Sequence, residues 1–236
     1  MYSIIISVFY MGSIYAVPQV IKNLLSDDER EYIMKEVEDK FYISTVSEDY
    51  TLDEQVRVSE SAWLNSDDPI VRNIIDRCLT HTDLPFTNCE RIVVVRYKPG
   101  GFYLPHQDAY ENAKNMRMHT FILALNDDYE GGETSFPNIN KEYKLHKGDA
   151  LFFETLDNHE MITHKALHGG NPVKSGDKWI CNLWVRKCPF APTECGAGRA
   201  LRALEERRRD ANDIRKIDSR TTQQNPHTME VESLQQ

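Results

Sequence analysis

The chain has 236 residues, of which 40% are hydrophobic and 28% are charged, so we expect one globular domain with a sizeable core. Its formal net charge of −9 and isoelectric point near 5.4 argue against tight nucleic-acid binding, which needs clustered cations to displace counterions from phosphates. We therefore expect no nucleic-acid partner.

The N-terminal residues 1–17 contain no charged side chain and resemble the apolar part of a signal peptide. No Lys or Arg precedes this run, which is short for a membrane span, although the small Ala16 would suit a cleavage site. The alternative is an extra strand packed on the sheet. Both the endoplasmic reticulum lumen and the cytoplasm stay open as compartments, and we expect membrane contact only if residues 1–17 act as an anchor.

The remaining chain divides by composition. We expect an apolar segment at 1–16 that acts as a signal or an anchor, a folded domain at 17–190, and a charged tail at 191–236. In the tail, apolar residues at near-helical spacing among many arginines predict an exposed amphipathic helix at 199–218, followed by disorder. Cys188 and Cys195 are candidates for a small disulfide loop or for two free thiols. The oligomeric state is left open.

Two helices are predicted ahead of a strand-rich region. Ser26 with Glu29 forms a capping box, and Asp68 followed by Pro69 opens a segment with apolar residues at helical spacing. Short apolar strands are expected at 91–97, 101–108, 118–126, 149–153, 161–168 and 178–187, separated by Gly, Pro, Asn and Asp turns. The pattern predicts an all-β core with the helices covering the sheet.

Candidate metal ligands occur in the predicted strand 101–108. Residues i and i+2 of a strand face the same side, so His106 and Asp108 would enter one cavity while Gln107 points away. Two imidazoles and one carboxylate hold Fe(II) on one face and leave the opposite positions open for substrate and oxygen. Each of these residues alone is more often an ordinary core or surface side chain, and only the combination favours a metal site.

The second imidazole must come from a distant strand, where His159, His164 and His168 are available. We prefer His168, because it closes the run 161–167 and precedes a glycine turn, and we keep His164 in reserve. Lys178 lies ten residues further along, at the start of an apolar run. A buried ammonium is costly without an anion, so Lys178 is a candidate anchor for the carboxylate of a dicarboxylate cosubstrate.

Five ordered blocks, at 91–108 (RIVVVRYKPGGFYLPHQD), 117–126, 131–137, 147–153 and 168–186, resemble the prolyl 4-hydroxylases, which are 2-oxoglutarate- and Fe(II)-dependent dioxygenases. Lysine at 178 makes the collagen-type and plant-type branch the nearer relative. The resemblance implies a double-stranded β-helix, a jelly roll of the cupin-like type, with flanking helices. It also implies hydroxylation of proline in a peptide, coupled to O2 and to decarboxylation of 2-oxoglutarate to succinate and CO2, with L-ascorbate as reductant.

The resemblance also implies roles for individual residues. By motif, iron would be held by His106, Asp108 and His168, and 2-oxoglutarate by Lys178 with help from Tyr97 and Thr134. The family positions that line the peptide groove match Arg57, Ser59, Glu90, Tyr103, Arg117 and Trp184. Such side chains suit an extended proline-rich peptide, because aromatic faces contact pyrrolidine rings and polar groups bond exposed carbonyls. Each of them has the alternative of being an ordinary core or surface residue.

Three departures from the family pattern leave other substrates open. Ala124 stands where many relatives carry tyrosine, Asn171 precedes Pro172 where cysteine is frequent, and Arg186 replaces a common histidine near the substrate. The alternative is an oxygenase of the same fold acting on another peptide side chain, a free amino acid or a nucleobase. A non-catalytic binding module is less favoured, because no binding role requires an open iron site.

Overall fold

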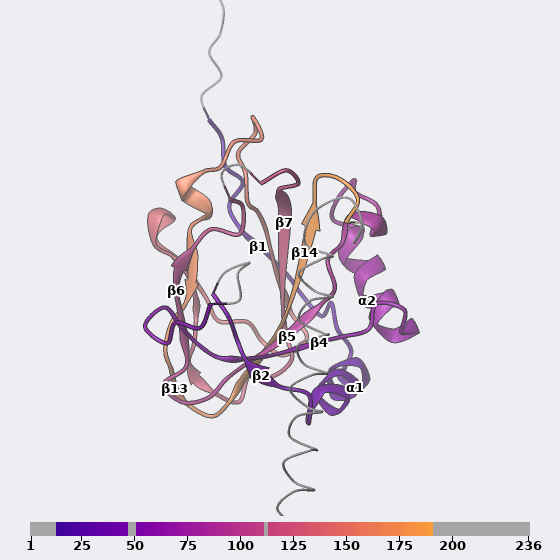
Figure 1. Ribbon diagram of the computed structural model, residues 1–236, viewed down its shortest axis with the longest axis vertical. Coiled ribbons are helices and arrows are strands. Elements are labelled where there is room, and N and C mark those ends of the chain that lie inside the picture. Colours follow the sequence, from indigo (N-terminus) through magenta and orange to yellow (C-terminus); the bar gives the residue numbers. More distant parts are fainter. Residues whose placement is uncertain (1–12, 47–50, 111–112, 191–236) are drawn as a thin grey trace, which may run out of the picture. The chain divides into compact units, whose positions relative to one another are not determined.

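The core of the protein is a pair of facing β-sheets, shown in Figure 1 by a computed structural model that describes residues 13–46, 51–110 and 113–190. The larger sheet runs in the order β1 (Gln19–Ile21), β11 (Ala150–Glu154), β7 (Arg117–Ala124), β14 (Lys178–Arg186), β5 (Val93–Tyr97), β4 (Glu60–Trp63) and β2 (Tyr42–Ile43). The smaller sheet runs in the order β10 (Lys141–Tyr143), β9 (Thr134–Phe136), β12 (His168–Gly170), β6 (Phe102–His106) and β3 (Arg57–Val58). A separate pair joins β13 (Val173–Ser175) and β8 (Glu130–Gly131).

The strands within each sheet pair antiparallel, and the two facing sheets form the jelly roll that was expected from the sequence. Neighbouring strands in both sheets come from distant parts of the chain. In the larger sheet, for example, β14 lies between β7 and β5. Three short 3-10 helices, Phe86–Asn88, Pro137–Ile139 and His164–Ala166, connect the strands.

The two predicted helices are confirmed, with their caps. In α1 (Asp27–Val37), Ser26 Oγ accepts the Glu29 N–H, and the Glu29 carboxylate accepts the Ser26 N–H in return. In α2 (Pro69–Leu79), the Asp68 carboxylate accepts two N–H groups of the first turn. Buried side chains of both helices pack with the outward faces of β5, β7 and β14, so the helices cover one face of the larger sheet, as Figure 1 shows.

Alternation along β14 determines which side chains reach the space between the sheets. Cys181, Leu183 and Val185 pack toward the helices, whereas Ile180 and Trp184 belong to the cluster between the sheets. Lys178 has the same parity as Ile180, so the pleat places it on the interior side. The strand therefore places the Lys178 ammonium in the interior between the two sheets.

Two of the predicted strands differ from the structure. The expected strand 161–168 is wrong: a single bridge pairs Ile162 with Leu156, a 3-10 helix follows, and β12 begins only at His168. Thr163 Oγ1 accepts the Lys165 N–H and starts that short helix, a local bond that competes with strand pairing. The expected strand 101–108 ends at His106, so Asp108 follows the strand rather than belonging to it.

The start of the described chain packs against the domain. Ser13 Oγ donates to Asp157 at 2.6 Å, the Ile14 N–H donates to Asn158 Oδ1 at 2.7 Å, and the Tyr15 side chain is buried. Most of the apolar segment, the predicted helix at 199–218 and Cys195 lie outside the described residues, so the predictions for them are untested. Within the described residues, none of the helices has the length and apolar character needed to cross a bilayer.

Candidate metal centre and cosubstrate pocket

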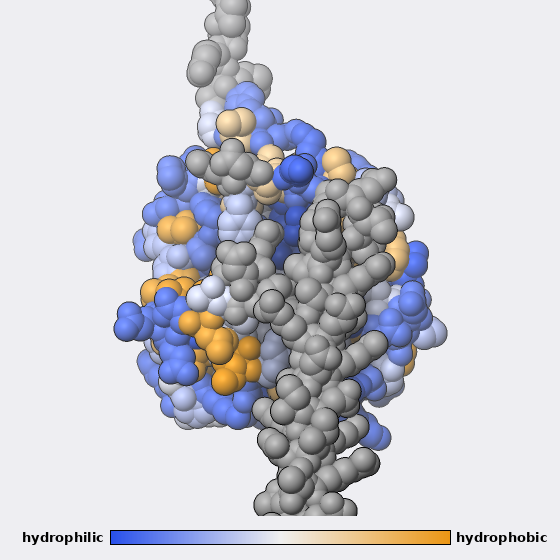
Figure 2. Space-filling view, in the orientation of Figure 1, coloured by the Kyte–Doolittle hydropathy of each residue, from blue (hydrophilic) through white to orange (hydrophobic). Residues whose placement is uncertain are grey.

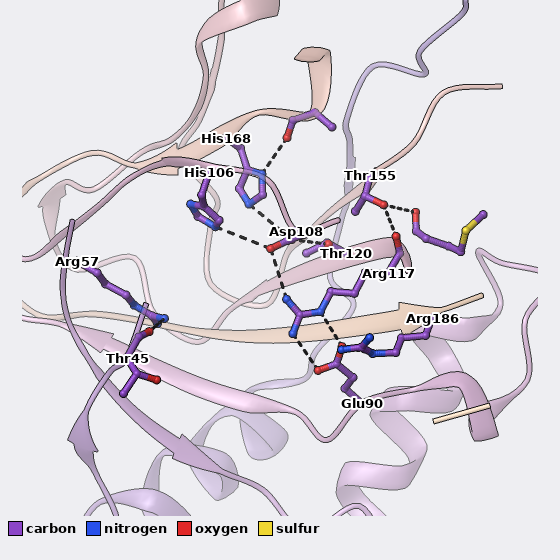
Figure 3. A network of polar contacts seen from close by, with 12 residues as sticks. Thr45, Arg57, Glu90, His106, Asp108, Arg117, Thr120, Thr155, His168 and Arg186 are labelled. Carbon is purple, nitrogen blue, oxygen red and sulfur yellow. Dashed lines mark hydrogen bonds and ion pairs between the residues drawn. The ribbon is translucent and has the colours of Figure 1, made fainter. Parts of the chain in front are cut away.

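Three side chains meet at one place between the sheets, as Figure 3 shows: His106 at the end of β6, Asp108 just after it, and His168 at the start of β12. Their ligand atoms all lie within 4.8 Å of one another. His106 Nε2 is 3.8 Å from Asp108 Oδ1, and His168 Nε2 is 3.7 Å from Asp108 Oδ2. Donors about 2.1 Å from one ion stand roughly 3 Å apart, so a small contraction would bring this set around a metal.

The backbone selects the tautomer of both histidines. His106 Nδ1 lies 2.9 Å from the Leu104 carbonyl oxygen, and His168 Nδ1 lies 3.0 Å from that of Ala166. Because a carbonyl can only accept, each Nδ1 carries a proton, and in the neutral imidazole each Nε2 then keeps a lone pair. Both lone pairs therefore lie on the side of Asp108, which is the arrangement that a metal ion requires.

Burial and neighbouring charges set the ionisation of these groups. Burial lowers the pKa of His106 to about 3, with a smaller contribution from repulsion whenever His168 is protonated, so this imidazole is neutral. Burial alone would raise the pKa of Asp108, but the two histidines, the Arg117 guanidinium and the Thr120 hydroxyl hold it below its usual range. Thr120 Oγ1 donates to Asp108 Oδ2 at 2.7 Å. The carboxylate is thus ionised and held in one orientation.

Behind Asp108, one buried carboxylate is shared by two arginines (Figure 3). Glu90 accepts two hydrogen bonds from Arg117, at 2.6 and 2.9 Å, and a third from Arg186 at 2.8 Å. Arg117 Nη1 also lies 3.9 Å from Asp108 Oδ1. Burial opposes ionisation of Glu90, but the two guanidinium groups lower its pKa. Glu90 and Arg117 were both predicted to line the peptide groove. In the structure this pair contacts the candidate ligand set through Arg117.

A second polar pocket surrounds Lys178. Its ammonium is buried, donates to the Gly132 carbonyl oxygen at 2.7 Å and lies 5.3 Å from the centre of the Tyr97 ring. Burial lowers the pKa of Lys178 to about 8, with Glu133 opposing and Lys144 adding to the shift. Within the described part of the chain, one carbonyl and a ring face leave much of this cation unsatisfied, so its surroundings suit an anion. Tyr97 and Thr134 are buried as well.

Similarity to known proteins agrees with this geometry. The model of the 2OG-Fe(II) oxygenase superfamily matches residues 92–186. A protein of Acanthamoeba polyphaga mimivirus, named as a candidate prolyl 4-hydroxylase, is 34% identical over 188 residues, 75% of this chain and 77% of that protein. Prolyl 4-hydroxylase 1 of Arabidopsis thaliana is 32% identical over 192 residues, 71% of this chain and 68% of the plant protein. The chain belongs to the prolyl 4-hydroxylases.

Solved structures of this family share the fold. The viral collagen prolyl hydroxylase of Paramecium Bursaria Chlorella virus-1, in its 2OG complex, matches with a TM-score of 0.59 and 30% identity over 73% of this chain and 97% of that chain. A Trichoplax adhaerens prolyl hydroxylase in complex with a peptide fragment of a hypoxia inducible factor has a TM-score of 0.56 at 19% identity, which is a likeness of fold. This prolyl 4-hydroxylase family member is therefore a dioxygenase that depends on Fe(II), 2-oxoglutarate and O2.

The residues expected in the peptide groove form two groups in this family member. Arg57 donates to Ser59 Oγ at 2.7 Å and lies 4.7 Å from the centre of the Tyr103 ring, and Tyr103 stacks on His106. The second group contains Glu90 and Arg117 together with Trp184, whose ring lies 3.8 Å from the Arg117 guanidinium carbon. Both groups contact the ligand set, one through His106 and the other through Asp108.

Two other histidines and two further residues lie near or apart from the centre. His159 and His164 are exposed and are not among the three residues that meet at the centre. Sequence reasoning overlooked Thr120, although a hydroxyl at an interior position of an apolar strand is a usable signal. It also overlooked Asn182 Oδ1, a buried acceptor on β14 between Lys178 and Trp184 that has no hydrogen-bond partner among the described residues.

Proposed function

We propose that this dioxygenase hydroxylates proline side chains in an extended peptide, at Fe(II) held by His106, Asp108 and His168. The observation that carries the proposal is that both histidine lone pairs lie toward one ionised carboxylate. This set satisfies one face of an ion and leaves the others for cosubstrate and oxygen. When bound, the iron supplies the oxidative chemistry that couples O2 and decarboxylation of 2-oxoglutarate to C–H hydroxylation.

In this proposal, Lys178 binds the distal carboxylate of 2-oxoglutarate. Among the described residues, its buried ammonium contacts the Gly132 carbonyl and the Tyr97 ring, so a carboxylate would supply a direct countercharge. Tyr97 and Thr134, both buried, would add hydrogen bonds from hydroxyl groups. We include L-ascorbate as the reductant that keeps the metal in its ferrous state.

The peptide would lie across Arg57, Ser59, Glu90, Tyr103, Arg117 and Trp184. The Trp184 ring, with the Arg117 guanidinium against one face, offers a flat surface for a pyrrolidine ring, and Tyr103, stacked on His106 and contacted by Arg57, offers its edge. Arg57 contributes hydrogen-bond donors for backbone carbonyls, which are free in a polyproline II peptide. Edge strands β2 and β3 and strand β6 carry the exposed apolar side chains Ile43, Val58 and Leu104, and Figure 2 shows apolar residues gathered in one area of a largely hydrophilic face.

Mass spectrometry of matched peptides tests this function. The protein is incubated with Fe(II), 2-oxoglutarate, ascorbate and a proline-rich peptide, and in parallel with the same peptide in which alanine replaces the prolines. We expect the mass of one oxygen atom to be added at proline in the first peptide only, and Asp108→Ala to abolish the addition. Succinate formation without peptide oxidation would favour another substrate, which would agree with the departures from the family pattern at Ala124 and Arg186. Absence of any metal-dependent turnover would favour a binding module.

We also propose that the catalytic unit is the domain expected at 17–190, since every residue assigned above lies within it. The environment of Arg186 distinguishes this member of the family. Its guanidinium shares Glu90 with Arg117 and donates to the Asn115 carbonyl oxygen at 2.6 Å. Two arginines against one glutamate make this part of the groove more positive than a neutral histidine would, which favours peptides that present carbonyl or acidic groups there. The net charge of −9 supports a protein or peptide partner over nucleic acid.

A further inference from the structure

The pairing of β6 with β12 contains a break in register beside the metal centre. His106 pairs with His168, and Tyr103 pairs with Gly170. Three steps along β6 therefore correspond to two steps along β12, so β6 holds one extra residue at Leu104 and Pro105. This is a β-bulge, which bends a strand and re-aims its side chains. Proline, which has no backbone N–H, is tolerated here because a bulged residue need not donate a hydrogen bond to the neighbouring strand.

The bulge puts Tyr103 and His106 on the same side of the strand. In a regular strand, residues three apart point to opposite faces. Here the two rings are stacked, with centroids 3.7 Å apart and planes inclined by 19°. The carbonyl oxygen of Leu104, inside the bulge, also accepts a hydrogen bond from the His106 Nδ1–H group. The bulge thus sets both the direction of the His106 ring and its tautomer.

The opposite strand allows the bulge because it has glycine there. A Cβ atom at Gly169 would lie 2.9 Å from the Tyr103 carbonyl oxygen, 3.0 Å from the Pro105 nitrogen and 3.2 Å from the Leu104 carbonyl carbon. All three neighbours are backbone atoms, so none of them can rotate away. A Cβ atom at the next residue, Gly170, would meet only the Tyr103 nitrogen, at an ordinary 3.8 Å. Neither glycine has a positive φ, so contact alone distinguishes them.

We propose that Gly169 is a positioning residue: its missing side chain lets the bulge at Leu104 and Pro105 form, and the bulge aims His106 at the metal. Tyr103 belongs to the same arrangement, since its ring fixes one face of the imidazole while Arg57 lies against the tyrosine. The inference rests on the proposed role of His106 as a ligand. It adds a requirement at a residue that touches neither metal nor peptide.

Metal affinity of two neighbouring variants tests the inference. Binding of Mn²⁺ is measured by electron paramagnetic resonance at a temperature well below the unfolding midpoint of every protein tested. These proteins are the wild type, Gly169→Ala, Gly170→Ala and His106→Ala. We expect Gly169→Ala to weaken binding by about tenfold or more, as loss of a ligand-orienting contact does, and Gly170→Ala to bind like the wild type. Equal affinities for the two glycine variants would overturn the inference.

A second pair keeps the inference testable if Gly169→Ala fails to fold. Tyr103→Phe retains the stacked ring and should bind Mn²⁺ like the wild type, whereas Tyr103→Leu should bind more weakly. Equal binding by these two variants would contradict the role given to the bulge. Failure of the ligand assignment itself has a different signature, because the wild type would then bind no Mn²⁺ or His106→Ala would bind it unchanged.

Discussion

Replacing Lys178 by methionine should separate the stability of the fold from its use of 2-oxoglutarate. The ammonium is buried, and its described contacts are the Gly132 carbonyl and the Tyr97 ring. Methionine has a similar length and no charge. The variant should therefore keep the packing of the pocket while losing the group that we assign to the cosubstrate carboxylate.

The size of the stability effect follows from the pKa of Lys178. Burial lowers it from 10.5 to about 8, and each unit corresponds to ~1.4 kcal/mol, so charging the folded protein costs about 3 kcal/mol at pH 7. Since the folded pKa is below the unfolded one, the cost is fully present below pH 8 and disappears between pH 8 and 10.5. Loss of the partner of the Gly132 carbonyl offsets about 1–3 kcal/mol of the gain. The variant should thus be as stable as the wild type or slightly more stable.

Urea denaturation at pH 7, with and without 2-oxoglutarate and Mn²⁺, measures both effects, and Lys174→Met provides a control at an exposed lysine. At a hundredfold excess over its dissociation constant, the ligand should stabilise the wild type and the control by about 2.7 kcal/mol, and should hardly affect Lys178→Met. The reasoning is refuted if 2-oxoglutarate stabilises all three proteins equally. It is also refuted if the ligand-free variant loses several kcal/mol.

Three further outcomes are expected. Affinity of the wild type for 2-oxoglutarate, measured by calorimetry, should fall as the pH rises from 7 to 9, because Lys178 loses its proton near pH 8; a flat profile would contradict this. Urea denaturation should show that Glu90→Gln destabilises the protein by about 3–5 kcal/mol, because two buried guanidinium groups lose their shared countercharge. Glu60→Gln, at a partly exposed ion pair, should cost under about 1 kcal/mol. Thr120→Val should weaken Mn²⁺ binding by about tenfold and Thr120→Ser should restore it; unchanged binding by the valine variant would show that its bond to Asp108 is dispensable.

Local signals were sufficient for the two α-helices and for the longer strands β5, β6, β7, β11 and β14, but not for the shorter strands. The cap residues Ser26 and Asp68 precede apolar helical spacing, and both caps are present in the structure. The apolar residues of segment 161–168 predicted a strand, whereas Thr163 Oγ1 accepts the Lys165 N–H and a 3-10 helix begins there. Propensity and hydrophobicity do not reveal such local competition.

The site was predictable to the extent that its residues are close in sequence or carry unusual chemistry. His106 and Asp108 lie together, although the reason differs from the expected one, since the strand ends at His106. The nearness of His168 depends on its pairing with His106 across two strands, which sequence spacing does not encode. The sharing of Glu90 by Arg117 and Arg186 could not be predicted either, because β7 and β14 must pair to join the two arginines and the Glu90 N–H must bond the Trp184 carbonyl oxygen.

A crystal structure with Mn²⁺ and 2-oxoglutarate tests the central claim most directly. Anomalous scattering locates the metal without reference to any model of the site. We predict one ion bound by His106 Nε2, Asp108 and His168 Nε2, with the distal carboxylate of 2-oxoglutarate on the Lys178 ammonium. A metal bound by other side chains, or a cosubstrate carboxylate away from Lys178, would contradict the account.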